Sequence, residues 1–479
     1  MKNLSLFNLS GAARAVAGAL VLFLCVGAAA AQGYKEAKVD DSFAAKKDAV
    51  LNGGDAAEVK EFLTKYYLAR WTVQANGSQL HVFREELIAD GARLTGGAQE
   101  TFLKEAVDAL TKYAASKDCY PACRYNAVLA IGTLDVKAAP ERNASGTPYA
   151  GAIKPLASFC TSDKEFPDYV RLGALVGLTR HAALGIEDET LRNGVRKVFS
   201  EMLDEKYATA KKLRPEIGEW FQARALEGLT SFKTPEGPDG PTGTLDLLKK
   251  IVDNDKLDFD LRASAARGIG AMDLTKTANW DFVALATSLT TLARDFCVSE
   301  SARIDSELLR EQVKSAAATT GATTGGMGGG PGAAMGGMSG GPGGAMGGMS
   351  GQQSQKSLEA MVARVQHGFG AVQAAIKGAG GGSGALAVLD EKNEKAAAAK
   401  EMLNETLAEI ENTNKFIVEG PKNPTGMAGM AGANYAAAQG GRGGRGKKAF
   451  VIMVDSASMK DHLLQQKLRY NELLGVSSF

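Results

Sequence analysis

The chain has 479 residues and a formal net charge of +1, from 55 basic and 54 acidic side chains. This balance gives no indication of nucleic acid or an acidic surface as the main partner. Hydrophobic residues make up 45% of the chain, so most of it should fold, while aromatic residues make up only 7%. Abundant alanine and glycine therefore favour thin helices packed through small side chains over a large aromatic core.

The N-terminal segment has the pattern of a secretory signal peptide. Basic residues precede an apolar run over residues 15–26, and small residues suited to cleavage after Ala29 or Ala31 follow. The apolar run is short for a membrane span, which argues against the alternative of an uncleaved anchor. We therefore expect residues 1–31 to be removed and the mature protein to be exported, periplasmic or extracellular, with no further membrane span.

A polar leader is expected over residues 32–54, and helical periodicity then runs from Asp55 to Leu309 with no alternating strand pattern. Within this region four segments align with one another at a period near 45 residues. Three of them begin with arginine, whereas the third begins with Gln222, which puts a shared interaction of this arginine position in doubt. The four segments are residues 124–132, 171–179, 222–230 and 262–270.

Two columns of small residues lie three positions apart in the alignment. Residues three apart share one face of a helix, so the columns predict a flat strip that a neighbouring helix can approach closely. An isoleucine or leucine follows the second column in every segment and is expected to fill the adjoining groove. The predicted repeat-packing residues are Ala127 and Ala130, Ala174 and Gly177, Ala225 and Gly228, and Ala265 and Gly268.

An amphipathic helix precedes these segments, for example over residues 102–113, 191–202 and 245–252, so each unit is a helix–turn–helix. The sequence here resembles the HEAT-repeat family, whose second helix often carries an arginine, then an alanine, then a glycine–leucine-like pair. The resemblance covers roughly residues 99–275. It implies an all-α fold, a right-handed α-solenoid of HEAT-like helix–turn–helix repeats. An irregular helical bundle is the alternative.

We place the repeat domain at residues 55–316, with a helix from about Trp280 to Leu309 as its cap. Residues 317–356 and 424–448 are glycine-rich segments that cannot bury enough apolar surface to become ordered, so we expect disordered linkers there. Helical periodicity returns in residues 357–423. Residues 449–479 are expected to form an apolar, strand-like start and a last helix. Docking of these C-terminal segments on the array is left open.

Four of the cysteines remain after removal of the signal peptide, and export permits disulfides. Cys119 and Cys123 flank the turn between two predicted helices, and Cys160 falls near the corresponding turn of the next repeat. We predict one disulfide among these three, with Cys119–Cys123 as the local pairing and a link to Cys160 as the alternative. Cys297 is expected to be a free, buried thiol. A redox or metal role is less favoured because the spacing is not Cys-x-x-Cys.

The sequence reveals no catalytic motif. A phosphate-loop-like run at residues 441–448 has lysine where that motif needs serine or threonine, and the strand-like run follows it instead of preceding it. A metal site needs converging ligands, and the histidines are not paired in the sequence. We therefore expect a protein that is not an enzyme and that requires no cofactor. The histidines are His81, His181, His367 and His462.

The leading functional interpretation is an exported scaffold that binds a protein or polymer partner through the surface of its stacked helix pairs. A second interpretation is sequestration of Cu(I) or of an anionic polymer by the linkers, since arginine–glycine segments such as residues 441–448 can fold on acidic surfaces. An enzyme with its active site in the C-terminal segment is the third. That segment is short and poor in nucleophile–base pairs.

Paired methionines in the linkers underlie the copper hypothesis, because soft thioether ligands suit Cu(I). A low-complexity linker that happens to use methionine is the competing interpretation. The competing interpretation predicts that the isolated linker peptide, titrated with Cu(I), binds the ion no more tightly than free methionine does. Tighter binding would support copper sequestration. The thioethers concerned are those of Met335, Met338, Met346, Met349, Met427 and Met430.

Overall fold

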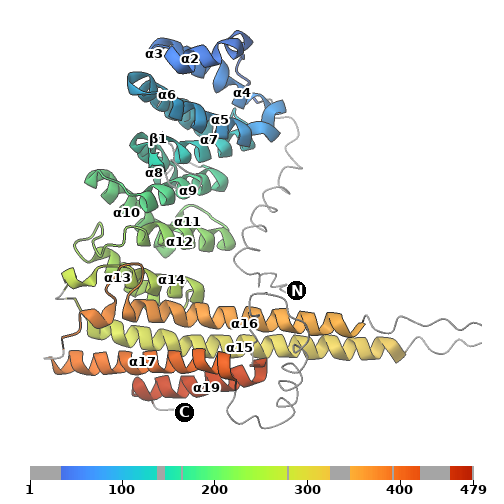
Figure 1. Cartoon of the computed structure of the whole chain (residues 1–479), viewed down its shortest axis with the longest axis vertical. Coiled ribbons are helices and arrows are strands. Elements are labelled where there is room, and N and C mark those ends of the chain that lie inside the picture. The colour runs from blue at the N-terminus through green and yellow to red at the C-terminus, as the bar shows by residue number, and fades with distance from the viewer. Residues whose placement is uncertain are drawn as a thin grey trace, which may run out of the picture. The chain divides into compact units, whose positions relative to one another are not determined.

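A computed structural model describes residues 34–137, 146–162, 166–277, 280–323, 346–390, 393–420 and 454–476, without the side chains of residue 205 and residues 315–355. The described chain is mostly helical, as predicted (Figure 1). One short antiparallel hairpin, β1 (Asp135–Lys137) with β2 (Thr147–Pro148), was not predicted. The predicted signal peptide and the linker at residues 424–448 lie outside the described residues.

The chain divides into two compact units, residues 1–177 and residues 178–479. The boundary falls inside helix α9 (Asp168–Leu184), so the predicted repeat domain at residues 55–316 contributes to both units. The first unit begins with η2 (Asp41–Lys46), α2 (Lys47–Gly53), α3 (Ala56–Phe62), the π-helical turn η3 (Leu63–Tyr67), α4 (Ala69–Thr72), η4 (Gln74–Gln79) and α5 (Leu80–Arg93). It continues with α6 (Gly96–Ala115), α7 (Pro121–Thr133), β1, β2, η5 (Ala150–Ala152), α8 (Ile153–Thr161) and the start of α9.

Residues 34–54 are part of the folded first unit, which corrects the prediction of a polar leader at residues 32–54. Val50 and Leu51 of α2 are buried, and the backbone N–H of Lys35 donates to the carbonyl oxygen of Asp118 at 3.0 Å. The segment is polar in composition, because charged residues separate its few apolar ones. Those few are enough to fix the segment because α3 and α5 provide a surface for them.

The second helices of successive pairs in the first unit run parallel and in register. Residues on α7 contact residues on α9 that lie 44 or 45 positions further along the chain: Tyr125 with Tyr169, Val128 with Gly173 and Gly132 with Gly177. A Cβ atom on Gly177 would lie 2.9 Å from the Cα atom of Gly132 and 3.0 Å from a methyl carbon of Leu156 on α8. The missing side chains therefore allow the two backbones to meet at Gly177, which belongs to the predicted small-residue columns, and at Gly132, which does not.

Buried arginines join the two helices of a pair. Arg124 on α7 donates from Nε to the carbonyl oxygen of Ala114 at the end of α6, at 3.0 Å. Arg171 on α9 donates from Nη1 to the carbonyl oxygens of Phe159 and Cys160 at the end of α8, at 3.2 and 3.1 Å. The last carbonyls of a helix have no partner within the helix, so each arginine caps the C-terminus of the helix before it.

The second unit continues with the same kind of element. Its helices after α9 are α10 (Glu189–Leu203), α11 (Glu205–Ala210), α12 (Pro215–Thr230), α13 (Gly243–Asp253), α14 (Phe259–Gly270) and η6 (Leu274–Thr277). They are followed by α15 (Phe282–Thr323), α16 (Met346–Lys377), η7 (Ala385–Ala387), α17 (Glu394–Glu419) and α19 (Ser456–Leu473). Helices α10 and α12 form one pair and α13 and α14 form the next.

Two glycines of the second unit, Gly228 and Gly268, lie at close contacts with neighbouring helices. Gly228 on α12 faces the ring of Phe199 on α10, and a Cβ atom there would overlap the ring. Gly268 on α14 faces the Cγ2 methyl of Thr230 on α12 and a methyl of Leu248 on α13. Arg262, the arginine of this pair, donates from Nε to the carbonyl oxygen of Val252 at the end of α13, at 2.9 Å.

The pair that begins its second segment with Gln222 has a different turn. Helix α11 is inserted between α10 and α12, and the side chain of Asp204 caps its start by accepting from the backbone of Lys206. The path from the first to the second helix is therefore longer here than in the α13–α14 pair. The absence of arginine at position 222 coincides with this change of geometry, so the arginine cap belongs to the pairs with a short turn.

Helices α15 and α16 extend the stacking of the second unit. The helix α16 packs on α14 and runs parallel to it, because Arg267 meets His367 and Gly270 meets Ala374. Helix α15 packs on α13. Helix α15 thus takes the position of the first helix of a further pair, and α16 that of the second helix. The ring centroids of Phe296 and Phe369 lie 4.9 Å apart between them.

This arrangement answers whether the C-terminal segments dock, and it shifts the predicted linker boundaries. Helix α15 continues to Thr323 and α16 begins at Met346, so both ends of the predicted linker at residues 317–356 are helical. The glycine-rich composition predicts disorder, but each end of this predicted linker continues a long helix. Residues 324–345 lie outside the described part of the chain.

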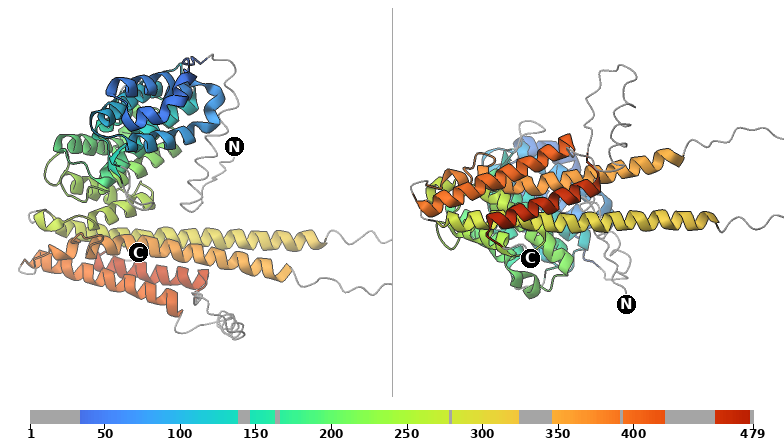
Figure 2. Two further views of the ribbon diagram at one scale, coloured as in Figure 1. Left: turned by 45° about the horizontal axis from the view of Figure 1, so that its top comes forward. Right: turned by 90° about the horizontal axis from the view of Figure 1, so that it is seen from below.

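Helices α15, α16, α17 and α19 lie side by side (Figures 1 and 2). The hydroxyls of Thr290 on α15 and Thr406 on α17 share a buried hydrogen bond of 3.0 Å. Arg364 on α16 pairs with Glu300 on α15 at 2.7 Å, and burial raises the pKa of that carboxyl. Val454, the one described residue of the predicted strand-like run, is buried and lies outside any strand.

One helix in the described residues is long and apolar enough to cross a membrane, although no second span was expected from the sequence. It is α15 over Phe282–Lys314, and half of its most apolar window is buried inside the fold. Its contacts with α16, α17 and α19 give that apolar surface protein partners.

The arginine caps predict a stability effect. Replacing Arg171 by methionine leaves two buried carbonyl oxygens without a donor, so we expect the free energy of unfolding to fall by about 2–3 kcal/mol in chemical denaturation. Lys112→Met, on the exposed side of α6, serves as the control and should change it by less than about 0.5 kcal/mol. Equal stability of the two variants would contradict the capping role.

Candidate functional site

A set of partly exposed apolar and aromatic side chains lies on the second helices of the first unit. Tyr125 and Leu129 are one turn apart on α7, and Tyr169, Leu172 and Val176 recur at helical spacing on α9. Each is partly open to solvent, and Val176 is 38% exposed. We call these five residues the tyrosine surface.

The packing described above positions the tyrosine surface. Gly173 lies beneath it, and a Cβ atom there would lie 3.0 Å from a methyl of Val128 and 3.5 Å from the ring of Tyr125. This close approach sets the rings of Tyr125 and Tyr169 edge to face, with centroids 6.5 Å apart. Their geometry is therefore fixed by helices and needs little ordering when a partner binds.

Arginine side chains affect the tyrosines of this surface. The guanidinium of Arg124 lies 5.8 Å from the centroid of the Tyr169 ring. Burial raises the pKa of Tyr125 and of Tyr169, and the nearby arginines only partly oppose it. Both phenols are therefore neutral near pH 7 and can donate a hydrogen bond.

A second pair of tyrosines borders the surface. The ring of Tyr34 packs edge to face on the ring of Tyr120, with centroids 6.1 Å apart. The hydroxyl of Tyr120 donates to the carbonyl oxygen of Val73 at 3.3 Å. Sequence reasoning missed both the surface and its border, because a tyrosine at a single helix position looks like an ordinary amphipathic residue.

The eight predicted repeat-packing residues do not contribute to this surface. All eight are buried at the contacts between helices. Because they are buried, a partner would not touch them.

The predicted disulfide among Cys119, Cys123 and Cys160 is not formed, since all three are free thiols. Cys160 is buried in α8, with its sulfur 4.0 Å from the carbonyl oxygen of Arg171 in its own helix pair. Cys119 and Cys123 are near enough to share a hydrogen bond. The predicted local pair is therefore close in space, although no bond joins the two sulfurs. Cys297 is free and buried, as predicted.

The four histidines lie on separate elements. His81 is exposed on α5, His367 is beside Arg267, and His462 stacks on Phe416 with ring centroids 4.2 Å apart. Among the described residues, no three or more histidine, cysteine or acidic side chains gather where they could hold a metal ion. The methionines proposed for Cu(I) lie outside the described side chains.

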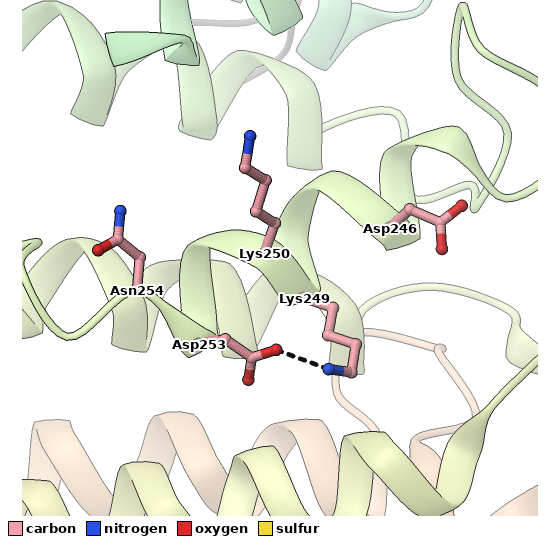
Figure 3. Close-up of a pocket in the computed structure, with 5 residues that line it drawn as sticks. All are labelled: Asp246, Lys249, Lys250, Asp253 and Asn254. Atoms are coloured by element: carbon pink, nitrogen blue, oxygen red, sulfur yellow. Dashed lines mark hydrogen bonds and ion pairs between the residues drawn. The ribbon is translucent and has the colours of Figure 1, made fainter.

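A shallow surface pocket in the second unit is lined by five side chains of one helix and its end, Asp246 to Asn254 on α13. Lys249 forms an ion pair with Asp253 at 2.6 Å. Lys250 and Asn254 point to the opposite side of the helix from Lys249 (Figure 3). Side chains that diverge from one helix cannot enclose a ligand, so we do not treat this pocket as a binding site.

No family model, curated protein or solved structure matches this chain. The resemblance to HEAT repeats therefore rests on the aligned sequence segments.

His181 on α9 gives a pH-dependent prediction for the second unit. Burial, with a smaller effect of Arg180, lowers its pKa to about 4, and its Nε2 atom has no hydrogen-bond partner. The unfolded chain takes up this proton near pH 6.5 and the folded chain only near pH 4, so stability is lost as the pH falls between these values.

We expect the wild type to lose about 3 kcal/mol more stability than His181→Phe between pH 7 and pH 4, in denaturant titrations at each pH. His81→Phe, at an exposed position, is the control and should follow the wild type. A His181→Phe variant with the pH dependence of the wild type would show that the imidazole is not kept neutral by the fold.

Proposed function

We propose that this protein is an exported, non-enzymatic scaffold that binds a protein partner through the tyrosine surface of its stacked helix pairs. The observation that carries the proposal is the set of rigid, half-exposed tyrosine, leucine and valine side chains on α7 and α9. Tyrosines on rigid elements supply a large amphipathic contact area at a low cost in side-chain entropy.

A HEAT-like α-solenoid is the architecture we propose for the repeats. Three kinds of contact favour it: parallel second helices in register, glycines at the crossings, and arginines that cap the preceding helix. The same three features recur on both sides of the boundary between the units. Within each unit, a stack of this kind presents its second helices as a face for a partner.

The composition of the tyrosine surface favours a protein over an anionic polymer as the partner. Its five members carry no charge, and the arginine nearest to it, Arg124, is buried and engaged with Ala114. An anionic polymer would need exposed cations that can replace its counterions. Export remains part of the proposal on the strength of the N-terminal sequence pattern alone.

The first experiment identifies the partner and its position. A photo-crosslinking amino acid at Leu172, in cells of the source organism, should capture one protein species in a specific adduct, and the same group at Tyr149 should not. Tyr149 is similarly half-exposed and lies beyond the tyrosine surface, next to β2. Equal capture from both positions, or none from Leu172, would contradict the proposal.

The second experiment measures affinity with the purified partner. Tyr125→Ala/Tyr169→Ala should weaken binding by about tenfold or more, because aromatic anchors dominate the energy of such interfaces. Tyr149→Ala should bind as the wild type does. Chemical denaturation of each variant separates a loss of binding from a loss of folding.

The linkers should be tested by shortening them, because truncation near residue 317 would uncover the faces of α14 and α15 that α16, α17 and α19 cover. Replacing residues 326–343 by a short glycine–serine segment leaves those helices in place. A scaffold that uses the tyrosine surface keeps its partner in this variant. Loss of the partner would favour the interpretation in which the linker binds.

A further inference from the structure

Two thiols of the first unit lie side by side at the start of α7. Cys119 immediately precedes Tyr120, the N-cap residue of the helix, and Cys123 is in the first helical turn. The chain turns between them so that the two thiols share a hydrogen bond. Both are free.

The two thiols differ in access to solvent. Cys119 is 7% exposed and follows the exposed residues Lys117 and Asp118 in the turn between α6 and α7, whereas Cys123 is fully buried. Both residues are buried, but Cys119 is the one with some solvent exposure, and it lies in the turn.

The two thiols also differ in acidity. The hydrogen bond from Cys123, assisted by the charge of Arg124, lowers the pKa of Cys119 below its ordinary value. The same hydrogen bond and burial raise the pKa of Cys123. The thiolate is the nucleophile in thiol–disulfide exchange, so Cys119 is the better nucleophile of the two. Cys123 would then be the resolving thiol.

We propose that Cys119 and Cys123 form a redox-active dithiol that exchanges with small-molecule disulfides such as oxidised glutathione. This goes beyond the proposed scaffold function and does not depend on it. The geometry that carries it is a pair of hydrogen-bonded thiols at the start of a helix, one with a small exposed fraction of 7% and one fully buried.

The exchange takes two steps. The Cys119 thiolate attacks one sulfur of the incoming disulfide, so that a mixed disulfide forms and one thiolate leaves. Cys123 then gives up its proton to that thiolate and attacks the sulfur of Cys119, which forms the Cys119–Cys123 bond and releases the second thiolate. The protein dithiol loses two electrons and the incoming disulfide gains them.

The other two thiols provide internal controls. Cys160 and Cys297 are fully buried, and burial raises the pKa of Cys160 to about 12 and raises that of Cys297 as well. Both should react only when the fold opens.

The experiment uses the full-length mature protein, reduced with dithiothreitol, freed of reductant and exposed to oxidised glutathione. Remaining thiols are alkylated at intervals and the protein is digested with trypsin, which releases Asp118–Arg124 with both cysteines in one peptide. We expect this peptide to lose two hydrogen atoms and to escape alkylation, about tenfold or more faster than Cys160 or Cys297 is modified.

Two variants test the order of the steps. Cys123→Ser should accumulate glutathione on Cys119, because the second step is missing, and Cys119→Ser should leave Cys123 unmodified. The proposal is overturned if the wild-type peptide remains alkylated at both cysteines, or if Cys160 and Cys297 react as fast. It is also overturned if glutathione stays on Cys119 in the wild type. If either variant fails to fold, the comparison of the four wild-type thiols still decides the matter.

Discussion

The contact of Gly132 with Gly177, where the backbones of α7 and α9 meet, is the constraint from which the first unit takes its geometry. Helices that touch without intervening side chains must lie in a narrow range of positions, because interiors are close-packed. The contact sets α7 and α9 parallel and in register, and so places Tyr125 beside Tyr169. In the second unit Gly268 and Thr230 play the corresponding part between α14 and α12.

Buried arginines complement these contacts at the ends of the first helices. A buried guanidinium is costly unless its donors are used, and Arg124, Arg171 and Arg262 each use theirs on carbonyl oxygens that the preceding helix leaves free. The small residues thus set the distance between successive pairs, and the arginines set the turn within a pair. Where α11 lengthens that turn, residue 222 is glutamine.

Much of the fold could be predicted because the small residues and the arginine recur at a regular interval, and one aligned segment predicts the burial of the next. The association of α16 with α14 could not be predicted, because α16 is separated from α15 by a long glycine-rich stretch and lacks the repeat pattern. The tyrosine surface could not be predicted for a related reason. That Tyr125 and Tyr169 are neighbours follows only from the 44-residue register between α7 and α9. The cysteine pairing was half predictable, since sequence spacing indicates proximity but not oxidation state.

A double-mutant cycle at Gly268 and Thr230 tests the central claim, that second helices stack through missing side chains, most directly. Gly268→Ala introduces a Cβ atom against the Cγ2 methyl of Thr230, and Thr230→Ser removes that methyl while keeping the hydroxyl. The account predicts that Gly268→Ala lowers the free energy of unfolding by about 1–3 kcal/mol and that Thr230→Ser restores about 1 kcal/mol of the loss. Independent effects of the two substitutions, or an unchanged stability of Gly268→Ala, would contradict it.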